Sequence, residues 1–181
     1  MIRALAIAVL IALASGPAGA DDPMRMLVYD LITQRLALMK PVAAWKHARG
    51  TPVEDLEREA VVVDRAAADA ALAGLDPETA RPFFVAQIEA AKAIQICWIA
   101  RWEADEAAKM TDPPDLNSEI RPELLAIGTT LLDAIRLALA EGVDFDPDNA
   151  SKFWEAVDLD CLDPAARDAI HRRLGGIRLA R

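Results

Sequence analysis

The sequence predicts an all-α protein, built as a bundle of about six helices. Helix-forming residues, chiefly Ala and Leu, dominate the chain. Runs of β-branched residues that would form strands are nearly absent, and Pro and Gly cluster at a few positions between helix-like segments. We expect a long, kinked first helix that forms a front unit with the next two helices, and a rear helical unit behind it.

The first twenty residues have the pattern of a cleavable secretory signal. Arg3 supplies a positive charge, an apolar run covers residues 4–14, and an Ala-x-Ala sequence ends at Ala20. The apolar run is shorter than the roughly 20 residues that cross a bilayer. We therefore expect cleavage after Ala20, export to the periplasm or medium without a membrane anchor, and a single domain over residues 21–181.

The chain is acidic, with a formal net charge of −9. Removal of the signal takes away one charge, that of Arg3, and leaves −10. Such a protein repels nucleic acid and anionic lipid, so neither is expected as a partner. A cationic pocket would have to be a local feature.

The first helix is expected over residues 23–47. Pro41 lies inside it and predicts a kink near Met39-Lys40, because proline lacks an N–H group and its ring collides with the preceding turn. Arg49-Gly50 should close this helix.

The second helix is expected to begin at Thr51. Thr51 would be the N-cap, with Pro52 at the first helical position and Glu54 at the third, which makes a capping box. Gly74 should end it.

The third helix is long and has one apolar face. Asp76-Pro77-Glu78 predicts its start, and it should end near Met110, before a loop at residues 112–115. Trp98 and Trp102 lie four residues apart on it, a spacing more typical of core residues than of a ligand platform.

The rear unit follows a loop at residues 112–117, which resembles a hinge and not a domain boundary. A fourth helix is expected over residues 119–141, ending at Gly142, and Asp146-Pro147 and Asp163-Pro164 predict the starts of shorter helices.

Two cysteines, Cys97 and Cys161, occur in a chain that is expected to reach an oxidising compartment. A disulfide between them is one interpretation. The other is that Cys97 is a buried thiol in an apolar helix, and the sequence leaves both open.

A set of polar residues recurs at fixed distances in this Ala/Leu-rich chain. Arg35 and Lys46 are eleven residues apart, which places them about 20° apart around a helix. Two antiparallel helices can bring such faces to one cleft. Charged residues at helical spacing are usually a solvated face, but arginines beside apolar residues are costly to bury without an anion. The set is Arg35, Lys46, Asp55, Arg58, Glu59 and Gln95.

The spacing of this set resembles the active-site pattern of the all-helical chorismate mutases, and the stretch around Trp45 resembles their exported subclass. The likeness covers most of residues 24–136 and is spread over three helices, so it is specific. The matching pieces are Arg35-Leu36, Pro41-Val42-Ala43-Ala44-Trp45-Lys46, Asp55-x-x-Arg58-Glu59, Phe83-Phe84-x-x-Gln87-Ile88, Ile94-Gln95, Trp102, Pro113-Pro114-Asp115-Leu116 and Arg121-Pro122.

The resemblance implies an isomerase that converts chorismate to prephenate by a pericyclic shift, without cofactor, metal or covalent intermediate. By position, Arg35 and Arg58 would bind carboxylates. Lys46 and Gln95 would donate to the ether oxygen of the breaking bond, Asp55 and Glu59 would accept from the ring hydroxyl, and Arg121 would add an arginine from the rear unit. The resemblance also implies a homodimer with each site complete in one chain.

At two positions this chain differs from some members of the family that it resembles. Ala91 stands where intracellular relatives carry a hydroxyl that assists carboxylate binding, and Lys92 or backbone groups are candidate substitutes. Gln95 stands where some relatives carry Glu, which donates only when protonated.

A second class of function is an exported helical protein that binds a small dicarboxylate or a protein partner without turnover. The complete polar set favours the enzyme, because a simple binder has little need of a second donor at the ether oxygen.

Two weaker patterns carry less weight. Residues 144–155 resemble an EF-hand calcium loop, but Asn149 replaces the turn glycine and Pro147 lies inside, so helix caps at Asp146 and Asp148 are favoured. His47 and His171 lack ligand partners at helical spacing and are expected on the surface or at caps.

Overall fold

The computed structural model describes residues 22–145 and 150–181. These residues form α-helices with short 3-10 and π segments, and their only strand-like pairing is an isolated bridge between Leu75 and Leu179. The all-α prediction is confirmed. The predicted secretory signal and the helix start at Asp146-Pro147 lie outside the described residues. The helices are α1 (Pro23–Ala37), α2 (Met39–Arg49), α3 (Leu56–Leu72), α4 (Pro77–Ala104), α5 (Arg121–Ala140), α6 (Ser151–Ala156) and α7 (Pro164–Leu174).

The long first helix is divided at Leu38, one residue before the predicted kink. Pro41 has no N–H to offer the carbonyl of Ala37, so the regular ladder stops there and α2 begins in a new direction. α2 ends where expected: Gly50 adopts φ +61°, and the Thr51 N–H donates to the Lys46 carbonyl at 2.9 Å.

The predicted start of the second helix is wrong. The Thr51 N–H is used to finish α2, so residues 51–55 form a connection and α3 begins at Leu56. Asp55 is its N-cap: its carboxylate accepts from the Arg58 N–H at 3.0 Å, and its own N–H donates to Glu59 at 3.1 Å. The reciprocal capping arrangement therefore exists, four residues later than predicted. α3 closes at Gly74, as predicted, with φ +85°.

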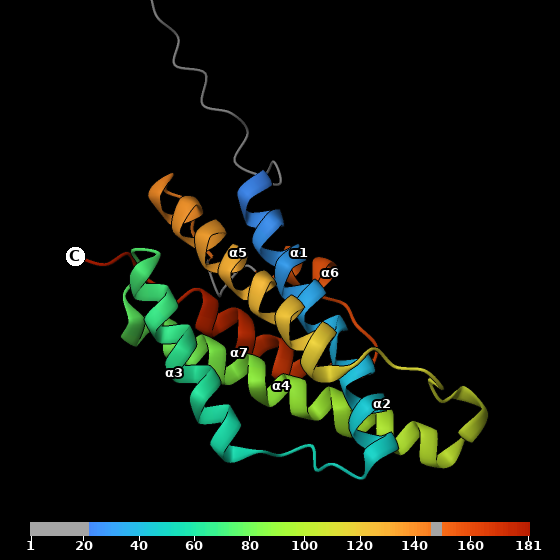
Figure 1. The fold of residues 1–181 in the computed structure, drawn as a ribbon. Helices are drawn as coiled ribbons and strands as arrows, with labels where there is room; N and C mark the ends of the chain where they lie inside the picture. Colours follow the sequence, from blue (N-terminus) through green and yellow to red (C-terminus); the bar gives the residue numbers. More distant parts are fainter. Residues whose placement is uncertain (1–21, 146–149) are drawn as a thin grey trace, which may run out of the picture.

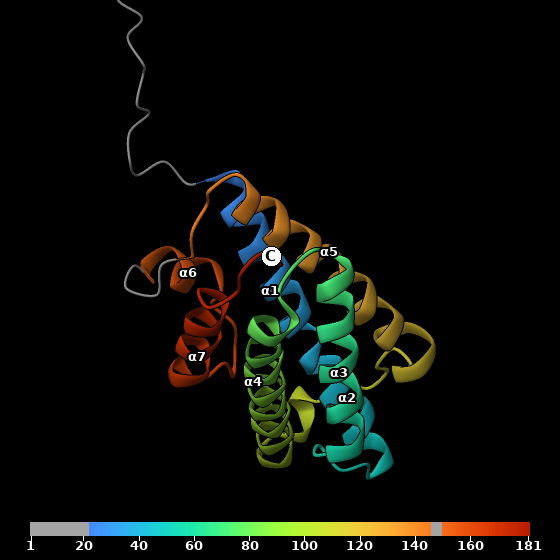
Figure 2. The same cartoon turned by 90° about the vertical axis from the view of Figure 1, so that its left-hand side faces the viewer.

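α4 begins at Asp76-Pro77 as predicted, but it ends at Ala104 and not near Met110. Asp105 leaves helical geometry, with φ −142°, and its side chain accepts from the Ala107 N–H to start a 3-10 turn, Glu106–Ala108. α4 is long and apolar enough to suit a membrane span by composition. In this fold it is the central helix, in contact with α2, α3 and α7 (Figure 2).

The rear unit packs directly on the front unit. α5 lies along α1, and α7 lies against α4, as both views show (Figures 1 and 2). α5 follows a π turn, Leu116–Ile120, and ends before Gly142, close to the predicted bounds. α7 begins after its N-cap Asp163, as predicted.

Most buried apolar residues form one cluster that joins both units, and Trp102 belongs to a second, smaller cluster with Ala43 and Ala44. Trp102 is 1% exposed and stacks on the partly buried Trp98, with ring centroids 5.8 Å apart, which confirms the core interpretation. His47 is partly exposed, but the prediction of a surface or cap position for His171 is wrong. His171 is 1% exposed and stacks on Phe153, because its position on α7 faces the core between Ile170 and Leu174.

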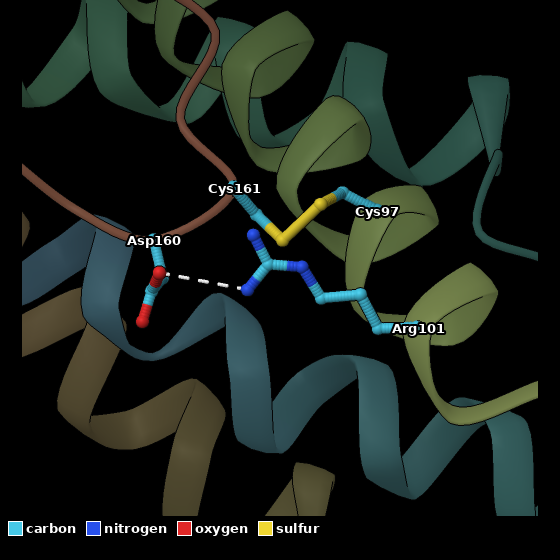
Figure 3. The surroundings of a disulfide bond; sticks show 4 residues. All are labelled: Cys97, Arg101, Asp160 and Cys161. Carbon is cyan, nitrogen blue, oxygen red and sulfur yellow. Dashed lines mark hydrogen bonds and ion pairs between the residues drawn. A yellow bond between two sulfur atoms is a disulfide. The ribbon is translucent and has the colours of Figure 1, made fainter. Parts of the chain in front are cut away.

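Cys97 and Cys161 form a disulfide, with their Cα atoms 5.7 Å apart (Figure 3). The bridge ties the C-terminal half of α4 to the segment between α6 and α7. Beside it, Arg101 on α4 pairs with Asp160 at 3.5 Å, so a second contact joins the same two segments. The open choice between bridge and free thiols is thus settled in favour of the bridge.

Removing the bridge should weaken the attachment of the rear unit. The bond closes a loop across a sequence separation of 64, and a disulfide typically contributes roughly 2–4 kcal/mol. We expect Cys97→Ala with Cys161→Ala to lower the free energy of unfolding by that amount in urea titrations. Reductant should lower the stability of the wild type and leave the double variant unchanged. Equal stability of wild type and variant would contradict a formed bridge, as would alkylation of the unreduced protein detected by mass.

Candidate functional site

A cavity of about 650 Å³ lies among α1, α2, α3, α4 and the start of α5. The residues that the sequence singled out come from all five helices, and every one of them lines this cavity. They are Arg35 on α1, Lys46 on α2, Asp55 as the N-cap of α3, Arg58 and Glu59 on α3, Gln95 on α4 and Arg121 at the start of α5.

Arg35 is held by α5 without being neutralised. Its Nη1 donates to the Leu124 carbonyl at 3.0 Å, and its guanidinium lies 5.9 Å from the centroid of the Phe84 ring. Gly128 of α5 lies beside this guanidinium, and a Cβ there would meet Nη1 at 3.6 Å, an ordinary van der Waals contact. Burial lowers the pKa of Arg35 to about 10, so the guanidinium is still charged at neutral pH.

Lys46 also finds a neutral acceptor. Its Nζ donates to the Val53 carbonyl at 2.7 Å. Burial lowers the pKa of Lys46 and so does the charge of Arg121, while Asp55 and Glu59 act in the opposite direction.

The remaining two cations follow the same pattern. Arg121 donates to the side-chain oxygen of Asn117. The guanidinium of Arg58 has no hydrogen bond or ion pair within the described part of the chain. None of the four cationic side chains forms an ion pair there with a carboxylate, although Asp55 and Glu59 line the same cavity and act on the pKa of Lys46. Such a wall is suited to an anion with more than one acidic group.

The carboxylates at the mouth are partly occupied by other contacts. Glu59 accepts from Lys92 at 3.1 Å and from the Asp55 N–H. Burial opposes ionisation of Glu59, but the bonds from Asp55 and Lys92 and the charge of Lys46 outweigh it and lower the pKa of Glu59. Asp55 caps α3 with one carboxylate oxygen.

Gln95 is 5% exposed. Its amide nitrogen donates to the Ala91 carbonyl at 3.0 Å and contacts the sulfur of Met39 at 3.6 Å, while its oxygen has no partner in the described residues. A thioether is a weak acceptor, so this second N–H is available to a stronger one.

Comparison with known proteins shows the family of this chain. The family model for chorismate mutase type II matches residues 27–96. The secreted chorismate mutase of Mycolicibacterium smegmatis is 34% identical over 137 residues, which cover 75% of this chain and 75% of that protein. The chain belongs to the chorismate mutase family.

Solved structures of the family agree with the fold. The secreted chorismate mutase from Yersinia pestis superimposes with a TM-score of 0.72 at 30% identity, covering 84% of this chain and 97% of that one. The chorismate mutase from Burkholderia thailandensis gives 0.68 at 32% identity and covers 86% and 99%. Several relatives are named secreted, in agreement with the expected N-terminal signal, and the protein is exported.

Two features of the cavity have residues that the motif contains but to which the sequence assigned no role. The Trp45 indole N–H donates to Asp115 at 3.2 Å, which links α2 to the π turn that precedes Arg121. Hydrogen bonds from Ser118 first, then from Trp45 and Asn117, lower the pKa of Asp115 to about 2.

The other feature is Gln87, a buried amide on the cavity wall. Its spacing of four residues from Ala91 and eight from Gln95 is the pattern that would have identified it.

Ala91 lines the cavity and provides no hydroxyl. Lys92, one expected substitute, is bound to Glu89 at 2.9 Å and to Glu59 at 3.1 Å, with Glu54 at 3.8 Å. Its charge is therefore neutralised by carboxylates, unlike the four cations above.

Asp55 both caps α3 and lines the cavity, and substitution can test the capping role by itself. Asp55→Ala removes the N-cap of α3 and should lower the free energy of unfolding by about 1 kcal/mol, whereas Asp55→Asn keeps a cap acceptor and should unfold like the wild type. Urea denaturation of the two variants measures the difference. Equal stability of both variants would show that the bond to the Arg58 N–H contributes nothing.

Proposed function

We propose that the protein converts chorismate to prephenate in this cavity, with the seven lining residues as its active site. The observation that supports the proposal is the set of four cationic side chains that no carboxylate neutralises within the described chain. Chorismate carries two carboxylates, and the family assignment supplies the reaction.

The reaction requires no covalent bond between the substrate and the protein. A pericyclic shift breaks a C–O bond and forms a C–C bond without proton transfer, so no nucleophile, acid or base is required. Two effects remain: holding the substrate in its folded conformer, and stabilising the negative charge that grows on the ether oxygen.

Each residue has a role that fits its position. Arg35 and Arg58 bind the carboxylates, for which the planar guanidinium is suited. Lys46 donates to the ether oxygen and a carboxylate, and Gln95 supplies the second donor to that oxygen. Arg121 adds a positive charge from α5 close to Lys46, since its charge acts on the pKa of that residue.

Asp55 and Glu59 accept from the ring hydroxyl of the substrate. Both keep acceptor capacity beyond their bonds within the protein, because an ionised carboxylate has about four acceptor sites. Glu59 is anchored by Lys92, which fixes the direction of its free lone pairs.

We also propose that residues 21–181 form the mature, single-domain protein and that it is a homodimer with each site complete in one chain. All seven residues line a cavity within a single chain. Sedimentation of the mature protein measures the oligomeric state.

The deciding experiment is direct. Mature protein is incubated with chorismate and the loss of chorismate absorbance is followed. Acceleration above the uncatalysed rate is expected. No acceleration would leave only a protein that binds a dicarboxylate or a partner without turnover.

The cations should each matter for the rate. Arg35→Ala, Lys46→Ala and Arg58→Ala are expected to lose about 3–4 kcal/mol of transition-state stabilisation in kcat/KM, as preorganised donors do. The matched control is Arg81→Ala: Arg81 lies on α4 outside the cavity and pairs with the exposed Asp64. Wild-type kinetics in the three site variants would exclude these roles, as would a loss of activity that arises only because the variants fail to fold.

The pH dependence should report the two donors. The wild-type rate should be flat near neutrality and fall on the alkaline side at a lower pH than for an ordinary lysine, because burial lowers the pKa of Lys46 and only its charged form donates. Gln95→Glu should make the rate rise toward acid, since a carboxyl donates only when protonated. Gln95→Met, which cannot donate at any pH, should be slow and flat. A flat profile for Gln95→Glu would exclude Gln95 as a donor.

A further inference from the structure

Gln87 is the most deeply buried polar side chain on the wall of the cavity. It is 1% exposed, against 5% for Gln95, and it lies on α4. Neither its amide nitrogen nor its amide oxygen has a hydrogen-bond partner within the described residues.

Such a side chain is costly to the fold. A buried donor or acceptor without a partner loses roughly 1–3 kcal/mol of hydrogen bonding to water, and most buried polar groups in proteins are therefore paired. Leucine or methionine would fill the same space without this loss. An unpaired buried amide on the wall of a binding cavity therefore points to a group of the ligand.

The position of Gln87 selects which part of the ligand it meets. Gln87, Ala91 and Gln95 follow one another at intervals of four residues, so they share one stripe of α4. Gln95 contacts Met39 at one end of this stripe. At the other end, Phe84 precedes Gln87 by three residues, and the Arg35 guanidinium lies 5.9 Å from the Phe84 ring centroid. Gln87 thus belongs to the Arg35 end of the cavity.

We propose that Gln87 is a substrate-binding residue, whose amide N–H donates to the carboxylate that Arg35 binds. This inference rests on the proposed function and adds a donor to it. Ala91, the next residue on the stripe, has no hydroxyl to donate, and Lys92 is already bound by carboxylates. A neutral amide supplies a directed hydrogen bond without adding another positive charge to the cavity.

The first test removes the amide and keeps the volume. Gln87→Leu and Gln87→Met should lower kcat/KM for chorismate at least tenfold, as loss of a hydrogen bond to a charged group does, while the melting temperature stays the same or rises. Gln34→Leu is the matched control, because Gln34 is an exposed glutamine on α1 that bonds to Asp30. A kcat/KM within twofold of wild type, with or without a change in melting temperature, would overturn the proposal.

Gln87→Glu provides a second variant of nearly the same size. Its carboxylate would face the carboxylate of the substrate, so the loss in kcat/KM should exceed that of Gln87→Leu at neutral pH and should diminish toward acid. A pH-independent effect, or none, would overturn the proposal.

Two double-mutant cycles locate the contact. Residues that bind the same carboxylate are coupled, whereas distant ones add. Gln87→Leu combined with Arg35→Lys should show less than the sum of the single losses in kcat/KM, and combined with Arg58→Lys it should be additive. Additivity with Arg35→Lys would overturn the assignment to that carboxylate.

Calorimetric binding of prephenate keeps this inference distinct from the proposed function. If the wild type binds prephenate but does not turn over chorismate, the proposed function fails, and at least tenfold weaker binding to Gln87→Leu would still support the contact. Equal binding by wild type and Gln87→Leu would overturn the contact, as would the absence of binding to the wild type.

Discussion

The structure depends on keeping four positive side chains around one cavity without neutralising them. The polar contacts that hold Arg35, Lys46 and Arg121 are to neutral oxygens: two backbone carbonyls and the Asn117 amide. A neutral oxygen orients a donor while leaving most of its charge available to a ligand. Lys92, on the same wall, is held by carboxylates and is a structural cation in consequence. The type of acceptor thus distinguishes the two kinds of cation: those held by neutral oxygens can bind a ligand, and the one held by carboxylates supports the structure.

This constraint explains how the helices are tied together. The Arg35 guanidinium requires α5 to lie close to α1, because it donates to the Leu124 carbonyl of α5. Arg121 requires the start of α5 to be fixed relative to α2, which the bond from Trp45 to Asp115 provides. The disulfide and the neighbouring pair of Arg101 with Asp160 hold the rear segment to α4 (Figure 3). The rear unit is therefore part of the site, because it supplies both a charge and the carbonyl that orients another.

The sequence predicted the residues of the cavity better than the ends of its helices. Helical spacing related Arg35 to Lys46 and Asp55 to Arg58 and Glu59. The family resemblance added a role for Gln95 and Arg121, and all seven residues line the cavity. The start of α3 was misplaced because Thr51 and Asp55 both carry N-cap chemistry, and only the completed end of α2 decides between them. His171 was expected at the surface and Gln87 was given no role, for a related reason: what a polar residue does when buried depends on neighbours from distant segments.

The donors on α4 follow the same physical logic as the cations. Gln95 is an amide where the chemistry also admits a carboxyl, and an amide donates equally well at any pH near neutrality, whereas a carboxyl must be protonated first. An exported protein works outside the buffered cytoplasm, so a donor that does not titrate keeps the site in one state as the surroundings change. Arg35 reinforces this, because even with its pKa lowered to about 10 it stays charged. Lys46 is then the group among the proposed donors whose charge sets the alkaline limit of the site.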